Sequence, residues 1–164
     1  MAKDGPAKAE KTLEPGDKAP SFKLPSDGGG AVSLADFKGR TLVLYFYPKD
    51  DTSGCTAEAI AFSAAEKDFK KAGATIAGIS KDSAASHDKF KTKHKLKLTL
   101  GADEETRTAA AYGVWVEKSM YGRRYMGMER ATFLIDGKGV IRRIWRKVKV
   151  PGHADEVLAA AKDL

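Results

Sequence analysis

A continuous run of aliphatic and aromatic residues occupies positions 41–47, TLVLYFY. Because it lacks the alternation of polar and apolar side chains seen in half-exposed strands, it predicts a central strand buried on both faces. The segment 75–80, TIAGIS, has the same character and predicts a second buried strand. A shorter strand is expected within 96–100, LKLTL.

The segments between these strands have a helical period. Ala59, Phe62, Ala65 and Phe69 recur at steps of three and four residues, so we expect one helix over 53–71. Its stop signal is the glycine at position 73. Further helices are expected across 84–93, from a cap at Asp103 to position 112, and over 153–164.

The late part of the chain predicts additional strands. Residues 115–129 have strand tendencies around a glycine turn, and 131–136 and 139–148 read as a hairpin around Asp136-Gly137. Strands that alternate with helices and end in a hairpin indicate an α/β protein with a central mixed β-sheet flanked by helices. A thioredoxin-like fold is the simplest layout that fits this order.

The composition is that of one globular domain. Of the 164 residues, 42% are hydrophobic, which is enough to bury a core without disulfides. We expect residues 1–12 to form a flexible tail and 13–164 to form the domain. The sequence shows no signal peptide and no run near the ~20 apolar residues of a membrane span, so no membrane association is expected. The single cysteine, Cys55, suits the reducing cytoplasm.

The net charge of +7 raises the question of anionic partners. The lysines are mixed with acids except in DKFKTKHKLK and IRRIWRKVK. We interpret these two segments as a solvated helix face and an exposed strand edge. Since no nucleic-acid-binding motif accompanies them, no nucleic-acid partner is expected.

Metal and cofactor sites are not expected. His87, His94 and His153 are predicted to be surface histidines rather than a zinc trio, because the nearby acids lack ligand spacing. Asp50 and Asp51 are interpreted as solvated turn residues. No glycine-rich phosphate loop is present in the sequence, which argues against a nucleotide cofactor.

Cys55 lies in the first turn of the predicted helix 53–71. A thiol reacts as its thiolate, and the free amides and dipole of a helix start favour an anion there. Pro48 turns the chain off the strand and could shield the sulfur, while Thr52 places a hydroxyl three residues before it. The alternative is a small, buried and unreactive cysteine, which is common for free thiols.

The spacing Pro48-x-x-x-Thr52-x-x-Cys55 resembles the signature of the peroxiredoxins, thiol peroxidases with a thioredoxin-like fold. The wider run YFYPKDDTSGCTAEA is similar to the subgroup named for bacterioferritin comigratory protein, also called the Q type. Four further segments resemble the same subgroup: GDKAPSFKLPSDGG, GISKDSAASHDKF, AYGVW and RATFLIDGKGVIRRIW. Together these segments cover the chain from about position 13 to its C-terminus.

The resemblance implies a role for each matching residue. Cys55 would be the peroxidatic thiolate that becomes a sulfenic acid. Thr52 would hydrogen-bond the sulfur and the peroxide oxygen, and Pro48 would shield the sulfenate. Arg130 would stabilise the thiolate and polarise the peroxide, because its guanidinium is a permanent cation with several fixed donors. Glu58 would orient Arg130.

One departure from the family pattern affects the catalytic cycle. Relatives with a second, resolving cysteine commonly carry it at the places that Ile60 and Lys91 occupy here. The chain therefore resembles the one-cysteine members. Its expected partners are peroxides and an external thiol, such as thioredoxin, glutaredoxin or a low-molecular-weight thiol. It is expected to act in antioxidant defence as a monomer, with a dimer as the alternative.

Two other functions fit the same fold. A non-catalytic holdase or binding protein would use the basic surface, and a low dose of peroxide would leave it unmodified. A disulfide reductase of the thioredoxin type would need Cys-x-x-Cys, whereas residues 52–58 contain one sulfur only.

Overall fold

The structure is a computed structural model that describes residues 12–164. The predicted tail, apart from Thr12, lies outside the described residues. The strands are β1 (Lys23–Pro25), β2 (Ala31–Ser33), β3 (Thr41–Phe46), β4 (Ala74–Ser80), β5 (Thr99–Ala102), β6 (Trp115–Met120), β7 (Arg123–Met128), β8 (Ala131–Ile135) and β9 (Ile141–Trp145). The helices are α2 (Ser53–Ala64), α3 (Glu66–Lys71), α4 (Ala84–His94), α5 (Arg107–Ala111) and α6 (His153–Lys162), with 3₁₀ turns η1 (Asp27–Gly29) and η2 (Leu34–Phe37).

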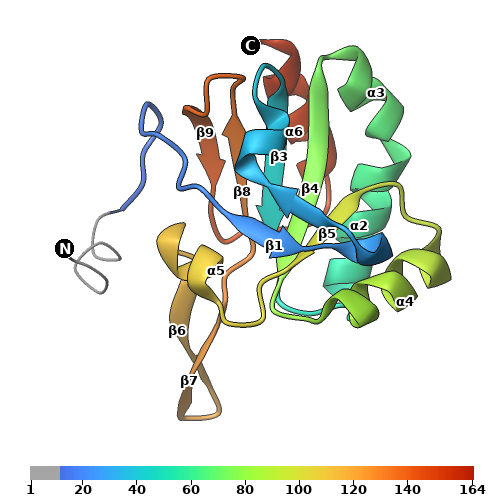
Figure 1. The fold of residues 1–164 in the computed structure, drawn as a ribbon. Coiled ribbons are helices and arrows are strands. Elements are labelled where there is room, and N and C mark those ends of the chain that lie inside the picture. Colours follow the sequence, from blue (N-terminus) through green and yellow to red (C-terminus); the bar gives the residue numbers. More distant parts are fainter. Residues whose placement is uncertain (1–11) are drawn as a thin grey trace.

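Five strands form the central sheet in the order β5-β4-β3-β8-β9 (Figure 1). β3 pairs in parallel with β4 and antiparallel with β8, so the predicted mixed sheet is confirmed. The predicted late hairpin is confirmed as β8 and β9. β3 is the middle strand, as its uninterrupted apolar sequence predicts.

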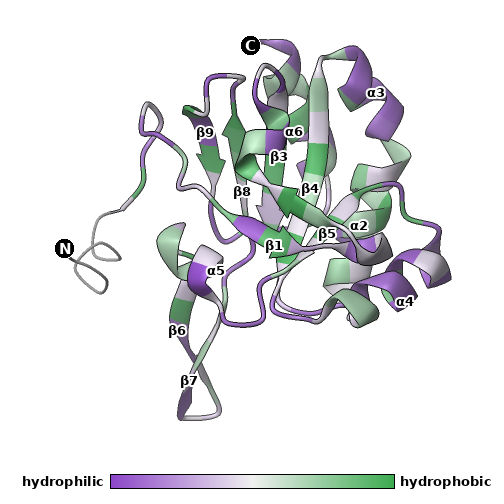
Figure 2. Ribbon diagram, viewed as in Figure 1, coloured by the Kyte–Doolittle hydropathy of each residue, from purple (hydrophilic) through white to green (hydrophobic). Residues whose placement is uncertain are grey.

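Both faces of the sheet are covered, and β3 contributes alternate side chains to each. Val43 and Tyr45 pack with side chains of α2, α3 and α6, whereas Leu42, Leu44 and Phe46 pack on the opposite face with α5, β2 and η2. This alternation follows from the two-residue period of a strand. Figure 2 shows the resulting pattern, with apolar residues along the central strands and polar residues on α3 and α4.

Two predicted helices have different limits in the structure. The single helix expected over 53–71 is divided at Ala65 into α2 and α3. The amide of Ala65 contacts three successive carbonyls, so the backbone is overwound at this point. α5 begins at Arg107, later than expected, but the Asp103 carboxylate accepts from the amides of Thr108 and Ala109 at 3.3 and 2.8 Å. Asp103 therefore satisfies first-turn amides as predicted, although Thr106 and not Asp103 occupies the N-cap position.

The excursion predicted at 115–129 is a two-stranded hairpin, β6 and β7, that projects from the rest of the fold (Figure 1). It returns to the sheet at Met128, two residues before Arg130. Within residues 12–164, no helix has both the length and the apolar character needed to cross a membrane.

Candidate active site

The candidate site begins where β3 ends. Tyr47 continues the strand, and Pro48–Thr52 form a loop that leads into the first turn of α2. Cys55 is the third residue of that helix and is 1% exposed. The predicted placement of the only cysteine at a helix start is therefore confirmed, in the turn where the backbone amides have no helical partner.

Arg130 reaches the sulfur because of the strand pairing. β3 and β8 are antiparallel, with Phe46 opposite Ala131, so the residue before β8 lies beside the end of β3. Arg130 Nη2 donates to Cys55 Sγ at 3.4 Å. The guanidinium passes over Gly54, where an added Cβ atom would lie 3.1 Å from Nη2. A side chain at position 54 would therefore push the guanidinium aside by a few tenths of an ångström.

Glu58 completes a chain of three side chains. It lies one turn after Cys55 on α2, and its Oε1 accepts from Arg130 Nη1 at 2.6 Å. The carboxyl is 2% exposed, and among the described residues its Oε2 has no hydrogen-bond partner. Burial raises the pKa of Glu58 to about 7, although the charge and hydrogen bond of Arg130 oppose the rise. Arg130 itself remains a cation at every physiological pH.

Thr52 and Pro48 also lie at the site, in the loop before α2. The Thr52 hydroxyl donates to the carbonyl oxygen of Lys49 at 2.8 Å. Because its single proton is used in this bond, the hydroxyl cannot donate to the sulfur as well. Its oxygen still has lone pairs that can accept a hydrogen bond. Pro48 is half-buried directly after the strand.

Asp50 differs from the prediction of a solvated turn residue. It is 7% exposed, and its carboxylate accepts from Tyr47 at 2.6 Å, Ser86 at 2.7 Å and His87 at 2.8 Å. These three donors compensate for the loss of water, which is why the acid can be buried. The adjacent Asp51 is exposed, as predicted.

Two of the three histidines predicted at the surface are buried. His87 is 0% exposed and His153 is 4% exposed, whereas His94 is partly exposed. The buried rings have polar partners: His87 contacts Asp50, and His153 Nε2 lies 2.8 Å from Thr132 Oγ1. Burial lowers the pKa of His153. Sequence reasoning missed these positions because nothing local to a histidine reveals a partner from a distant segment.

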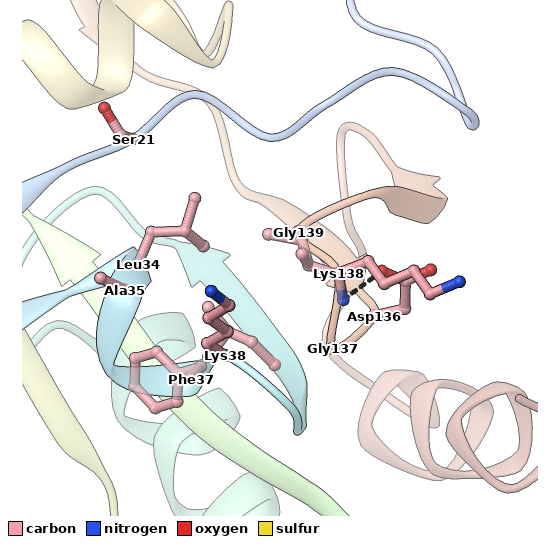
Figure 3. Close-up of a pocket in the computed structure, with 11 residues that line it drawn as sticks. Ser21, Leu34, Ala35, Phe37, Lys38, Asp136, Gly137, Lys138 and Gly139 are labelled. Atoms are coloured by element: carbon pink, nitrogen blue, oxygen red, sulfur yellow. Dashed lines mark hydrogen bonds between the residues drawn. The ribbon is translucent and has the colours of Figure 1, made fainter.

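A separate apolar cavity of about 260 Å³ lies at the other end of β3 (Figure 3). Phe37 and Leu34 line it on one side, and the β8–β9 turn, positions 136–139, lines the other. The turn is held by the Asp136 carboxylate, which accepts from the amide of Lys138 at 2.9 Å. None of the predicted site residues lines this cavity.

Residues 15–144 match the AhpC/TSA family. The chain is 48% identical over 153 residues to the Bacillus subtilis peroxiredoxin Bcp, an alignment that covers 93% of this chain and 98% of the relative. It is 40% identical over 151 residues to the Escherichia coli peroxiredoxin Bcp, an alignment that covers 92% of this chain and 97% of that relative.

Solved structures agree with these relatives. A Xanthomonas campestris peroxiredoxin Q superposes with a TM-score of 0.83 at 46% identity, covering 87% of this chain and 90% of that chain. A Xylella fastidiosa PrxQ mutant superposes with a TM-score of 0.88 at 38% identity, and the alignment covers 93% of this chain and 98% of that chain. The predicted thioredoxin-like fold is confirmed by these neighbours. Another structure concerns alkyl peroxide reduction by the Xanthomonas bacterioferritin comigratory protein.

The Xanthomonas protein also has two cysteines that have each been replaced by serine, 36 positions apart. In this chain Lys91 follows Cys55 by the same interval. With the match over residues 15–144 and relatives at 40% to 50% identity, the chain belongs to the AhpC/TSA family of peroxiredoxins, among the Bcp and Q proteins.

Proposed function

We propose that this protein reduces hydrogen peroxide and organic hydroperoxides through a sulfenic acid at Cys55. The observation that supports this site most directly is the fork of Arg130, which donates to the Cys55 sulfur and to Glu58 at the same time. The Bcp and Q relatives support a thiol-dependent peroxidase rather than a holdase. We propose the reducing cytoplasm as its compartment and antioxidant defence as its role.

The reaction begins at the thiolate of Cys55. Its sulfur attacks the terminal peroxide oxygen, so an S–O bond forms while the O–O bond breaks. The electron pair of the broken bond goes to the departing oxygen, which takes a proton and leaves as water or an alcohol. The sulfur is oxidised by two electrons to the sulfenic acid. Arg130 lies where negative charge moves from sulfur to oxygen, and fixed donors there lower the barrier.

Three further residues arrange the reactants. Glu58 fixes the plane of the Arg130 guanidinium through the 2.6 Å bond. Thr52 has already donated its hydroxyl proton to Lys49, so we assign its oxygen as the acceptor for the O–H of the incoming hydroperoxide. Pro48 excludes water from one side of the sulfenate. This assignment keeps the expected hydrogen bond between Thr52 and the peroxide and omits the expected one to the sulfur.

The return to the thiol needs a second molecule. A thiol from outside attacks the sulfenic sulfur, water leaves, and a mixed disulfide forms. A second thiol then displaces Cys55 from that disulfide. Thioredoxin, glutaredoxin and small thiols are the candidate donors, because Ile60 and Lys91 replace the resolving cysteine. We propose that the working unit is a monomer.

The experiment is an equimolar peroxide challenge of the reduced protein, followed at once by intact mass. We expect a gain of one oxygen atom on Cys55, which a sulfenic-acid reagent then labels. Cys55→Ser should gain nothing under the same conditions. A wild-type protein that stays unmodified while the peroxide persists would favour the holdase alternative.

A further inference from the structure

Helix α4 lies beside the loop that leads to Cys55, and its contacts with that loop are unusually polar. His87 and Ser86 of α4 both bond to the buried carboxylate of Asp50. Tyr47, the last residue before the loop, adds a third bond to the same carboxylate. Asp50, in the middle of the loop from Pro48 to Thr52, is therefore held in the protein interior by side chains of a helix that is distant in the sequence.

Both ring nitrogens of His87 lie within hydrogen-bond distance of an oxygen. His87 Nδ1 lies 2.8 Å from Asp50 Oδ2, and His87 Nε2 lies 2.9 Å from the carbonyl oxygen of Gly101. A carbonyl oxygen accepts only, so Nε2 donates to Gly101, and Nδ1 donates as well when Asp50 is an ionised carboxylate. The ring is then an imidazolium, and the pair is a buried salt bridge. Burial is the largest single influence and acts to lower the pKa of His87, but the hydrogen bond and charge of Asp50, the Gly101 carbonyl and the charge of Asp82 together outweigh it and raise the pKa.

The same loop is fixed at two further points. The Asp50 amide donates to Asp82 Oδ2 at 2.8 Å, and that oxygen also accepts from Ser80 at 2.6 Å. Asp51 pairs with Lys93 at 2.8 Å and with His94 at 3.0 Å, both in the last turn of α4. These contacts leave the loop little freedom to move away from α4.

α4 is itself attached on its other side. Lys91 pairs with Asp27 at 2.7 Å, and Asp88 accepts from the amide of Gly28 at 2.7 Å. Asp27 also accepts from the amide of Leu100 in β5. α4 thus connects the loop before Cys55 to η1 and to the edge strand of the sheet.

We propose that α4 is a clamp on the loop 48–52, and that His87 is a positioning residue for peroxide reduction. The buried His87–Asp50 salt bridge holds the loop so that Thr52 and the first turn of α2 face Arg130. This inference rests on the proposed function, since it concerns the same reaction. It assigns a role to a residue that contacts neither the sulfur nor Arg130 in the structure.

The test compares two rates at Cys55: oxidation by hydrogen peroxide and alkylation by iodoacetamide. Peroxide needs Thr52 and Arg130 in register, whereas alkylation needs only an accessible thiolate. In His87→Gln we expect peroxide oxidation to fall about tenfold, equivalent to ~1.4 kcal/mol, with a much smaller change in alkylation. Lys89→Gln, on the exposed side of α4, is the matched control and should retain both rates.

The salt bridge also predicts a coupling between two variants. His87→Gln leaves the Asp50 carboxylate buried without its cation, which is the costly arrangement. Asp50→Asn combined with His87→Gln removes that unpaired charge, so the double variant should be less impaired than His87→Gln alone. Equal peroxide rates in wild type and all these variants would overturn the proposal.

Two measurements keep the test decisive if the buried variants do not fold. Nitrogen-15 NMR of the reduced wild type should show that both ring nitrogens of His87 are protonated at pH 7. The titratable groups that face the ring are Asp50, Asp82 and Tyr47. A neutral ring would contradict the clamp. Asp51→Asn changes an exposed residue and should lower the peroxide rate about threefold. A wild type inert to peroxide would instead refute the proposed function.

Discussion

Arg130 supplies the only side-chain hydrogen bond to the Cys55 sulfur among the described residues. One nitrogen of its fork contacts sulfur and the other contacts Glu58. A lysine keeps the charge but offers a single nitrogen, so it cannot hold both contacts in one plane.

For Arg130→Lys we therefore expect the second-order rate of peroxide reduction to fall about tenfold or more, equivalent to ~1.4 kcal/mol. Stopped-flow kinetics with hydrogen peroxide would measure it. Arg142→Lys, at a half-exposed arginine of β9, is the control. An unchanged rate in the first variant would remove Arg130 from the mechanism.

Gly54 lies under the Arg130 guanidinium, and this contact allows activity to be separated from stability. In Gly54→Ala the new methyl would lie 3.1 Å from Nη2, so the guanidinium must move by a few tenths of an ångström and its bond to the sulfur is disturbed. We expect the peroxide rate to fall on the order of fivefold, or about 1 kcal/mol. Alanine favours a helix over glycine, so unfolding in urea should show no loss of stability. Ser53→Ala, in the same turn and exposed, is the control.

Glu58 makes the stability of the protein depend on pH. Its pKa rises from 4.5 in the unfolded chain to about 7 in the fold, chiefly through burial. Between these values the folded state keeps a proton that the unfolded state releases, so raising the pH lowers stability. The loss begins above about pH 4.5 and is complete above about pH 7.

Glu58→Gln removes this titration and keeps an oxygen for Arg130. The unfolding free energy of the variant, relative to that of wild type, should therefore increase from pH 5 to pH 8. Urea titrations of the reduced proteins at both values would measure the difference. Glu117→Gln, at an exposed site of β6, is the control. A difference that is the same at both pH values would contradict the prediction.

Helix α2 determines whether a resolving cysteine could be restored. In an intact helix, residues five apart have Cα atoms roughly 8.6 Å apart, whereas a disulfide usually needs less than about 7 Å. A bond from Cys55 to position 60 therefore requires the first turns of α2 to unwind. Ile60 is 46% exposed and restrains the helix little, so the restraint comes from the bonds of Arg130 to Cys55 and Glu58 and from the contacts of the preceding loop with α4.

In Ile60→Cys we expect slow and incomplete disulfide formation after one equivalent of peroxide. Adding His87→Gln releases the loop and should speed closure several-fold. Intact mass with thiol labelling would follow both proteins over time. Rapid and complete closure in Ile60→Cys alone would show that the first turns of α2 open freely.

The chain contains a single cysteine, so the sulfenic acid cannot be resolved by a disulfide within one chain. We expect peroxide consumption to stop after about one equivalent unless a thiol is added. Without a thiol, non-reducing mass analysis should show sulfenic acid, a dimer linked through Cys55, and then overoxidised forms. Addition of dithiothreitol before overoxidation should restore turnover. Sustained consumption with no reductant would contradict this prediction.

Much of the fold and the core of the site could be predicted because their signals are local. The apolar run of β3 is the middle strand, and the loop and helix that follow place Cys55 in a first turn. Glu58 is one turn later, so its proximity also follows from helix geometry. Element limits were less accurate, as at Ala65, because packing and hydrogen-bond geometry decide where a helix breaks.

The sequence by itself determined the class of the sheet, the position of the thiol and the family motif, because these depend on neighbours along the chain. The tertiary structure alone decided that Arg130, 75 residues away, donates to the sulfur, and that Asp50 and His87, 37 residues apart, form a buried pair. The β3–β8 pairing produces the first contact, and the packing of α4 against the loop produces the second. An arginine at a strand end, or an acid two residues after a proline, has no local feature that distinguishes a solvated side chain from a paired one. Only the folded chain brings in the partner that compensates for lost water.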